Sequence, residues 1–180
     1  MRRNRIVISG SGGQGVVLGG IILAEAAAIY EDRFATHNQS YGPEARGRAS
    51  KSEVIISDET IHYPEVENPD ILVALTQEAA DKFAKQLQPG GILIVDKKVK
   101  NLPSQGGYKT YVLPIRETAD SIRGEIVTNM VTLGALVAIT KIVSQEALRQ
   151  AIAARIPKGT EKINMQALSA GMQIAEGEAC

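Results

Sequence analysis

Cysteine is nearly absent from this chain: one residue in 180, Cys180, which is also the last. A disulfide needs two thiols, and structural zinc sites and iron–sulfur clusters are usually held by several thiolates. The chain therefore cannot build a disulfide framework, a zinc site or an iron–sulfur cluster alone.

The chain also lacks an excess of charge of either sign and any long apolar run. It has 20 basic and 20 acidic residues, so its net charge gives no reason to expect nucleic acid or an acidic membrane surface as a partner. No apolar stretch approaches the roughly 18 residues that span a bilayer, and no signal-peptide pattern follows the first charges. We expect a cytoplasmic protein.

Catalytic motifs are missing as well. The two histidines, His37 and His62, have no metal or triad spacing, and the sequence holds no Gly-x-Ser-x-Gly elbow and no Walker lysine pattern. His37 precedes a polar loop by two residues and could touch a ligand there, whereas His62 is expected at a strand end. The chain is not expected to catalyse a reaction alone, and no residue is assigned a catalytic or metal-binding role.

Hydrophobic patterning predicts an α/β protein. An apolar share of 44% and a length of 180 residues suit one well-filled core, so we expect a single domain over residues 1–180. The fold expected is an open, doubly wound, largely parallel sheet with helices on both faces. Strands are predicted at 5–9, 33–36, 52–57, 70–75, 92–96 and 108–113, and helices at 15–30, 76–87, 115–123, 130–142, 145–154 and 160–177.

A glycine-rich turn follows the first strand. Gly10, Gly12 and Gly15 satisfy G-x-G-x-x-G between a strand and a helix, where backbone amides can hold a phosphate. A dinucleotide site also needs an acidic residue after the second strand, and Glu31 and Asp32 come before it. An NAD site is therefore disfavoured against a structural turn, another phosphate site or a subunit surface. The candidate cofactor-binding residues are Gly10, Gly12, Gly13, Gln14 and Gly15, with Gln14 limited to orienting a ligand or backbone.

A second candidate site is the loop from Gln39 to Gly47, which is expected to join two strands. Gly42 and Pro43 suffice for a turn, so its further polar and charged side chains are surplus to making a bend. An arginine such as Arg46 can hold a carboxylate or phosphate through two parallel hydrogen bonds. The alternative is a solvated loop with a weak exposed salt bridge. The candidate interface or ligand residues are Gln39, Ser40, Tyr41, Gly42, Glu44, Arg46 and Gly47.

These two segments are where the sequence resembles the gamma subunits of 2-oxoacid:ferredoxin oxidoreductases. The resemblance covers nearly the whole chain, and the loop is its most specific part. One departure is Arg48, where the family tends to have a second glycine. The resemblance continues through Ala49-Ser50-Lys51-Ser52-Glu53-Val54, Tyr63-Pro64, Asp70 to Leu75, Gly90-Gly91, Asn129-Met130-Val131 and Leu133-Gly134.

The resemblance implies a subunit of a complex that converts a 2-oxoacid and coenzyme A into acyl-CoA, carbon dioxide and reduced ferredoxin. Thiamine diphosphate and the iron–sulfur clusters would be held by partner subunits, one of them ferredoxin-like, and ferredoxin would accept the electrons. The loop and the glycine-rich turn would form the face that meets the partner chains. The 2-oxoglutarate type is resembled more than the pyruvate or branched-chain types.

Other functions stay open at this stage. They are a free-standing nucleotide-binding module, a subunit of an indolepyruvate oxidoreductase and a purely structural scaffold. Asn129 is expected to cap the helix that starts near Met130. Asp96, at the end of a strand, could bind a ligand or cap the loop that follows.

Overall fold

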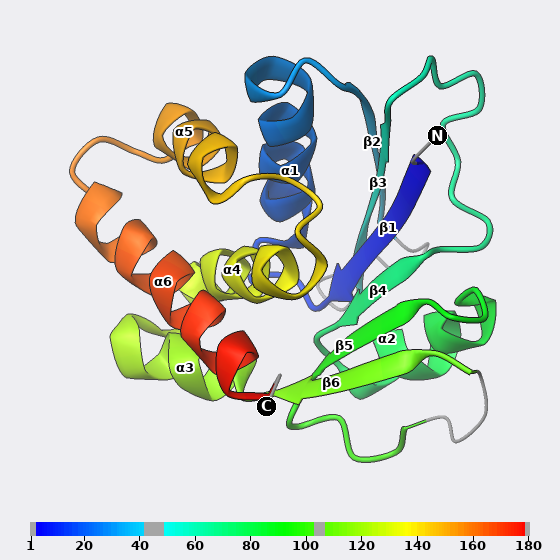
Figure 1. Ribbon diagram of the computed structural model, residues 1–180. Coiled ribbons are helices and arrows are strands. Elements are labelled where there is room, and N and C mark those ends of the chain that lie inside the picture. The colour runs from blue at the N-terminus through cyan, green and yellow to red at the C-terminus, as the bar shows by residue number, and fades with distance from the viewer. Residues whose placement is uncertain (1–2, 42–48, 103–106, 179–180) are drawn as a thin grey trace.

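The strands assemble into one mixed sheet in the computed structural model, which describes residues 3–41, 49–102 and 107–178. Their order across the sheet is β2-β3-β1-β4-β5-β6 (Figure 1). The bounds are β1 Arg3–Gly10, β2 Phe34–Tyr41, β3 Ser50–Ser57, β4 Ile71–Ala74, β5 Ile92–Asp96 and β6 Lys109–Leu113.

Four of these strands, β1, β4, β5 and β6, form a parallel block, whereas β3 is antiparallel to both of its neighbours. Because β3 lies between β1 and β2, the connection from β1 to β2 crosses over it. The largely parallel sheet is confirmed, with one antiparallel strand inserted. The strand predicted at 33–36 extends to Tyr41, so the first residues of the predicted loop belong to β2.

The central strands are apolar along their length because both faces of the sheet are covered. Every residue of β4 is buried, and so is every residue of β5 after Ile92. Alternate residues of these strands enter two separate hydrophobic clusters, with Val73 and Ile94 on one face and Leu72 and Leu93 on the other.

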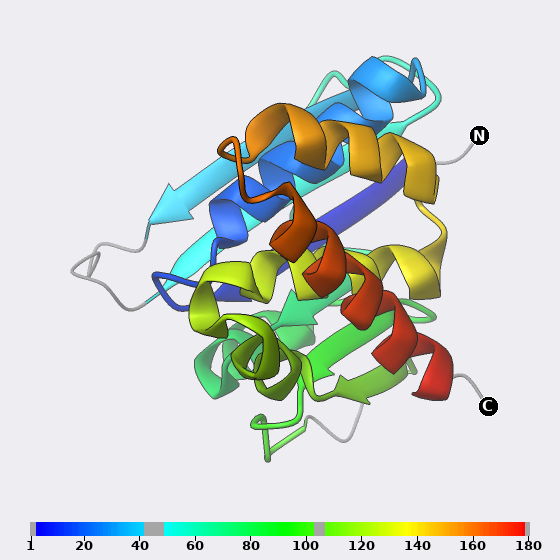
Figure 2. The ribbon, with the colours of Figure 1, turned by 90° about the vertical axis from the view of Figure 1, so that its left-hand side faces the viewer.

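Helices lie on both faces, as predicted, but unequally. One face carries most of them, layered as Figure 2 shows, and the other is covered by α2 (Gln77–Phe83) and the short 3-10 helix η1 (Ala84–Gln86). The helices of the first face are α1 (Val16–Tyr30), α3 (Ile115–Ile122), α4 (Thr128–Thr140), α5 (Gln145–Arg155) and α6 (Glu161–Glu178). The 3-10 turn η2 (Gly124–Val127) joins α3 to α4.

Helices α4 and α6 cross at two glycines. A Cβ placed on Gly134 would lie 2.1 Å from the carbonyl oxygen of Leu168, and one on Gly171 would lie 2.1 Å from that of Val131. Only residues without a side chain allow the two backbones to approach this closely.

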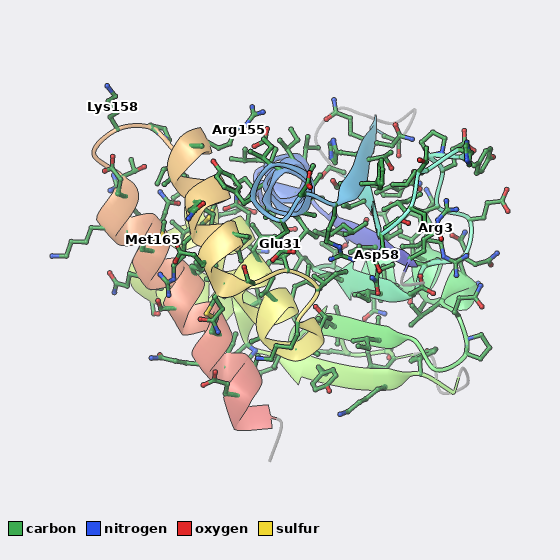
Figure 3. All side chains as sticks on the ribbon, turned by 45° about the horizontal axis from the view of Figure 1, so that its top comes forward. Arg3, Glu31, Asp58, Arg155, Lys158 and Met165 are labelled. Atoms are coloured by element: carbon green, nitrogen blue, oxygen red, sulfur yellow. The ribbon has the colours of Figure 1, made fainter. Side chains whose placement is uncertain are left out.

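An ion pair and two hydrogen bonds tie α5 and the segment before it to α1 and the segment that follows α1. Arg155 of α5 forms a two-pronged pair with Glu25 of α1, and Glu31 accepts a hydrogen bond of 2.5 Å from the backbone N–H of Ser144. Arg33 donates to the carbonyl of Ile142 at 2.8 Å. Figure 3 labels Arg155 and Glu31 at the two ends of this seam. The seam fixes α5 over the crossover between β1 and β2.

Candidate functional site

The glycine-rich turn connects the carboxyl end of β1 to the first residue of α1. Gly13 and Gly15 have φ angles of +95° and +67°, values that a residue with a side chain adopts at a cost. Gly15 takes the N-cap position of α1 and supplies no side-chain cap. Gly12 and Gly13 are exposed, so the turn presents bare backbone at the surface.

Gln14 lies inside this turn, with a side chain that is 1% exposed. Its Oε1 accepts a hydrogen bond of 2.8 Å from the backbone N–H of Ser11. A Cβ on Gly10 would lie 2.2 Å from the same oxygen, which explains a glycine there. The amide of Gln14 therefore holds the turn from within, and the backbone N–H that it occupies is not available to a ligand.

The start of α4 packs beneath the turn. A Cβ on Gly15 would lie 2.6 Å from Asn129 Nδ2, and one on Gly13 would lie 3.4 Å from the carboxylate of Glu125. The cavity that remains under the turn is about 10 Å³, too small for a phosphate. The predicted role of Asn129 as an N-cap is wrong, because the cap position belongs to Val127.

Asn129 is instead the second residue of α4, and its side chain fills the space that Gly15 leaves. Sequence reasoning missed this contact because the two residues are far apart along the chain. The only signal was that both belong to the segments that carry the family resemblance. Packing alone thus accounts for Gln14, Gly15 and Asn129, and the role of Gly10, Gly12, Gly13, Gln14 and Gly15 in cofactor binding stays a prediction.

Topology also separates this turn from a dinucleotide-binding unit. In such a unit the strand after the first helix pairs with the first strand, and its end carries the acidic ribose ligand. Here β3 intervenes between β1 and β2. The end of β2, where the acidic ribose ligand would be expected, is therefore separated from the turn after β1 by a whole strand.

On the opposite face of the sheet, a cavity of about 100 Å³ lies between the carboxyl end of β1 and α2. Ser9, Ser50 and Thr76 contribute hydroxyl-bearing residues to its lining, and Phe83 contributes its ring. Ser9 Oγ donates to the carbonyl of Ser50 at 3.2 Å. Phe83 is 8% exposed, so it forms an apolar wall for the cavity.

Two ammonium groups border this cavity. Lys51 Nζ and Lys82 Nζ lie 5.5 and 5.4 Å from the centre of the Phe83 ring. Lys51 is paired with Glu53 at 2.6 Å, whereas Lys82 forms no ion pair with any of the described residues. Glu78 is the acidic residue of the lining. The cavity combines cations, hydroxyls and an aromatic wall, which suits a ligand with an anionic group.

The predicted loop borders the same cavity. Gln39 and Ser40 lie in β2 and are exposed, and Ser40 and Ala49 line the cavity on either side of residues 42–48. Tyr41 is the last residue of β2. The remaining candidates, Gly42, Glu44, Arg46 and Gly47, lie outside the described residues, as do Pro43 and Arg48. The expectation that the loop joins two strands is confirmed, since β2 and β3 pair antiparallel.

The histidines are not brought together. His37 Nε2 lies 2.7 Å from Ser52 Oγ, and burial lowers the pKa of His37 below its usual value. Ser52 is fully buried and His37 is partly buried, and both side chains lie against Gly20 of α1. His62 lies in the connection between β3 and β4, not at a strand end, and is exposed.

Asp96 acts as a cap. Its carboxylate is 2% exposed and accepts hydrogen bonds from the backbone N–H groups of Lys98 at 2.9 Å and Arg116 at 2.7 Å. Of the two roles left open for it, the structure shows the capping one. Within the described ranges, no three His, Cys, Asp or Glu side chains gather into a metal-binding group. Over the same ranges, no single helix is long and apolar enough to cross a membrane.

Comparisons with known proteins agree with this architecture. Residues 5–174 match the family described as pyruvate ferredoxin/flavodoxin oxidoreductase. The chain is 46% identical over 177 residues to the 2-oxoglutarate synthase subunit KorC of Methanocaldococcus jannaschii, covering 97% of this chain and 95% of that protein. It is 44% identical over 184 residues to the corresponding subunit of Methanothermobacter marburgensis, covering 98% and 99%.

The chain is also similar to a pyruvate synthase subunit and to a solved gamma subunit. The pyruvate synthase subunit PorC of Methanocaldococcus jannaschii is 30% identical over 146 residues and is matched over 79% of this chain. A solved gamma subunit of a keto/oxoacid ferredoxin oxidoreductase from Geobacter sulfurreducens is 44% identical, with a TM-score of 0.90 and 99% of both chains covered. The resemblance drawn from the sequence is confirmed. The chain belongs to the pyruvate ferredoxin/flavodoxin oxidoreductase family, and within it to the gamma subunits of 2-oxoacid:ferredoxin oxidoreductases.

Proposed function

We propose that this chain is the gamma subunit of a complex that converts 2-oxoglutarate and coenzyme A into acyl-CoA and carbon dioxide. The electrons released pass to ferredoxin. One observation carries the choice of acid: identity of 44–46% over nearly full length to 2-oxoglutarate synthase subunits, against 30% over 79% of the chain to a pyruvate synthase subunit. The comparisons favour neither a free-standing nucleotide-binding module nor an indolepyruvate oxidoreductase.

Cofactor chemistry in this proposal belongs to partner subunits. Oxidative decarboxylation of a 2-oxoacid needs thiamine diphosphate as an electron sink and iron–sulfur clusters as electron carriers. This chain offers one cysteine to a cluster. We therefore assign thiamine diphosphate and the clusters to other polypeptides of the complex, one of them ferredoxin-like.

The carboxyl edge of the sheet is the face that we assign to the partners and to coenzyme A. Exposed backbone at Gly12 and Gly13 and the exposed residues Gln39 and Ser40 lie on this edge, next to the cavity beside Gly10. In open α/β sheets, ligands approach this edge. The recognition that we propose is electrostatic, since coenzyme A carries phosphates and Lys51 and Lys82 border the cavity.

The proposed reaction is tested by affinity purification of the chain from its own cells. Co-purifying polypeptides are identified, and the eluate is assayed for coenzyme A-dependent reduction of a viologen dye. We expect iron–sulfur and thiamine diphosphate polypeptides in the eluate and activity on 2-oxoglutarate. Activity only on pyruvate or a branched-chain 2-oxoacid would replace the proposed substrate, and a chain that elutes alone and inactive would refute the proposal.

The proposed face is tested in the assembled complex with Arg46→Ala and Lys82→Ala. Removal of a cation that meets a phosphate is expected to raise KM for coenzyme A by about tenfold at unchanged kcat. Lys85→Ala is the matched control. Lys85 is an exposed lysine of η1, three residues after Lys82, and it does not line the cavity. Arg46→Ala is expected to raise the same KM or to weaken assembly. Wild-type kinetics and assembly in both variants would overturn this assignment without touching the reaction.

A further inference from the structure

Strand β2 forms one border of the sheet and has a free edge. It pairs with β3 along all eight residues, from Phe34 opposite Ser57 to Tyr41 opposite Ser50. No other strand adjoins it (Figure 1). In the part of the chain that the structure describes, none of its outward backbone N–H and C=O groups has a hydrogen-bond partner. Such a row of unpaired groups is a template for another strand.

Nothing in the sequence of β2 protects this edge. Proteins usually guard an exposed edge with proline, lysine or other charges, a bulge or a short strand. The eight residues of β2, FATHNQSY, include no proline, no glycine and no acidic residue, lysine or arginine, and their register with β3 is unbroken. An edge of this length without protection is expected to be covered in the working protein.

The opposite border of the sheet shows the contrast. Strand β6 has five residues and begins with Lys109, whose Nζ lies 4.9 Å from the centre of the Tyr111 ring. Its exposed residues are Lys109 and Thr110. Strand β6 therefore has a short edge with a charge at its start, and β2 has neither of these features.

Exposed apolar side chains occur at the start of β2 and at the end of the helix that precedes it. Phe34 is 49% exposed, and Ile29, in the last turn of α1, is 65% exposed. Thr36 Oγ1 is buried and has no hydrogen-bond partner. Exposed apolar groups close to an unpaired strand edge are typical of a surface that a partner covers.

We propose that β2 pairs antiparallel with β2 of a second copy of this chain, so that the two sheets join across a two-fold axis. Antiparallel pairing about a two-fold axis at His37 sets Phe34 opposite Ser40 of the other copy and joins residues 34–40 of each strand. Because the strand is uncharged, this register sets no like charges opposite each other, which is the usual bar to self-pairing.

Two-fold symmetry also gives the exposed Phe34 a partner surface. The antiparallel arrangement brings the start of each β2, with the exposed ring of Phe34, next to the carboxyl end of the other copy's strand. A contact of this kind is isologous and closes on itself, so it yields a dimer and no filament. The inference concerns the chain alone and holds whichever 2-oxoacid the complex uses.

Sedimentation equilibrium of the full chain over roughly 1–200 µM tests the proposal, and we expect a concentration-dependent dimer. In the double variant Phe34→Lys/Gln39→Lys, two exposed residues of β2 become lysines, and each dimer then carries like charges along the shared edge. We expect its dissociation constant to rise by about 100-fold, because the edge becomes one that proteins use to prevent pairing. Leu102→Lys/Gln173→Lys is the matched control, since both residues are exposed elsewhere, and its dissociation constant should match that of the wild type.

Hydrogen exchange locates the contact. Backbone amides of residues 34–40 should exchange more slowly in the concentrated chain than in the dilute chain, and circular dichroism verifies that the variants keep the fold. A chain that stays monomeric up to the highest concentration overturns the proposal, even if β2 proves to be protected by a different subunit in the complex. A dimer that withstands the β2 double variant overturns it equally.

Discussion

In the parallel half of the sheet β4 is buried at every residue, whereas β2, in the antiparallel half, has no fully buried residue between Phe34 and Ser40. The parallel strands lie under helices on both faces and form the stable core. The β2–β3 hairpin lies at the border, ends at the loop that carries the most specific family resemblance, and exposes polar backbone. Stability and interaction are thus placed in different halves of one sheet.

The largest difference in stability between the two halves is expected when a side chain is shortened to alanine in each. Leu93→Ala removes a fully buried side chain from β5 and should lower the free energy of unfolding by about 3 kcal/mol. Phe34→Ala removes a half-exposed ring from β2 and should cost at most about 0.5 kcal/mol in the dilute chain. Urea unfolding followed by circular dichroism measures both. Equal losses would show that the hairpin is as much a part of the core as β5.

A second substitution tests the turn at the junction of the halves. Gln14→Ala leaves the backbone N–H of Ser11 without its partner and opens a void beneath Gly10, so it should cost about 2 kcal/mol. The same urea titration on Gln39→Ala, an exposed glutamine of β2, should show a change within about 0.5 kcal/mol. If Gln14→Ala were as mild as its control, the turn would be held by the packing of α4 alone.

The pH dependence of stability should reflect the hairpin half. Burial lowers the pKa of His37, so the folded protein binds a proton there less readily than the unfolded chain. Stability from this residue is complete above the unfolded pKa of about 6.5 and falls as the pH drops below it. The wild type should therefore lose more stability than His37→Gln between neutral and mildly acidic pH. Parallel losses in the two proteins would exclude His37 as the source.

The smallest effect is expected in the helical layer. Lys141 ends α4 with a φ of +52°, a conformation that glycine adopts without strain. Lys141→Gly should raise the free energy of unfolding by about 0.5 kcal/mol, as relief of strain slightly exceeds the added flexibility of the unfolded chain. Lys141→Ala retains the Cβ and should give no gain. A loss of stability in the glycine variant would show that the lysine side chain contributes a contact of its own.

Local sequence patterns predicted the individual strands and the loop, because these depend on residues that are close along the chain. Ile92 to Asp96 was identifiable as a central strand because its first four residues are continuously apolar, and the structure has the same bounds. The loop between two strands followed from glycine and proline between two apolar segments. Position across the sheet did not follow, because the insertion of β3 between β1 and β2 is a choice among distant pairings that no local pattern encodes.

The candidate site shows the same division. The turn after β1 was readable from Gly10, Gly12 and Gly15, but its packing against Asn129 was not, since a buried asparagine near a helix start reads first as a cap. The cavity is lined by Lys51 from β3 and Lys82 from α2, two elements that are separated along the chain. Neither lysine stands out in the sequence, so the cationic cavity could be found only once the strands were in place.

The position of β3 has a consequence for synthesis of the chain on the ribosome. When β1, α1 and β2 have been made, the strand that must separate β1 from β2 has yet to be translated. The nascent segment thus holds two strands with no proper neighbour until Ser57 has emerged. Co-translational folding of this sheet must wait for β3, and a chain arrested earlier has two unpaired strands to offer a chaperone.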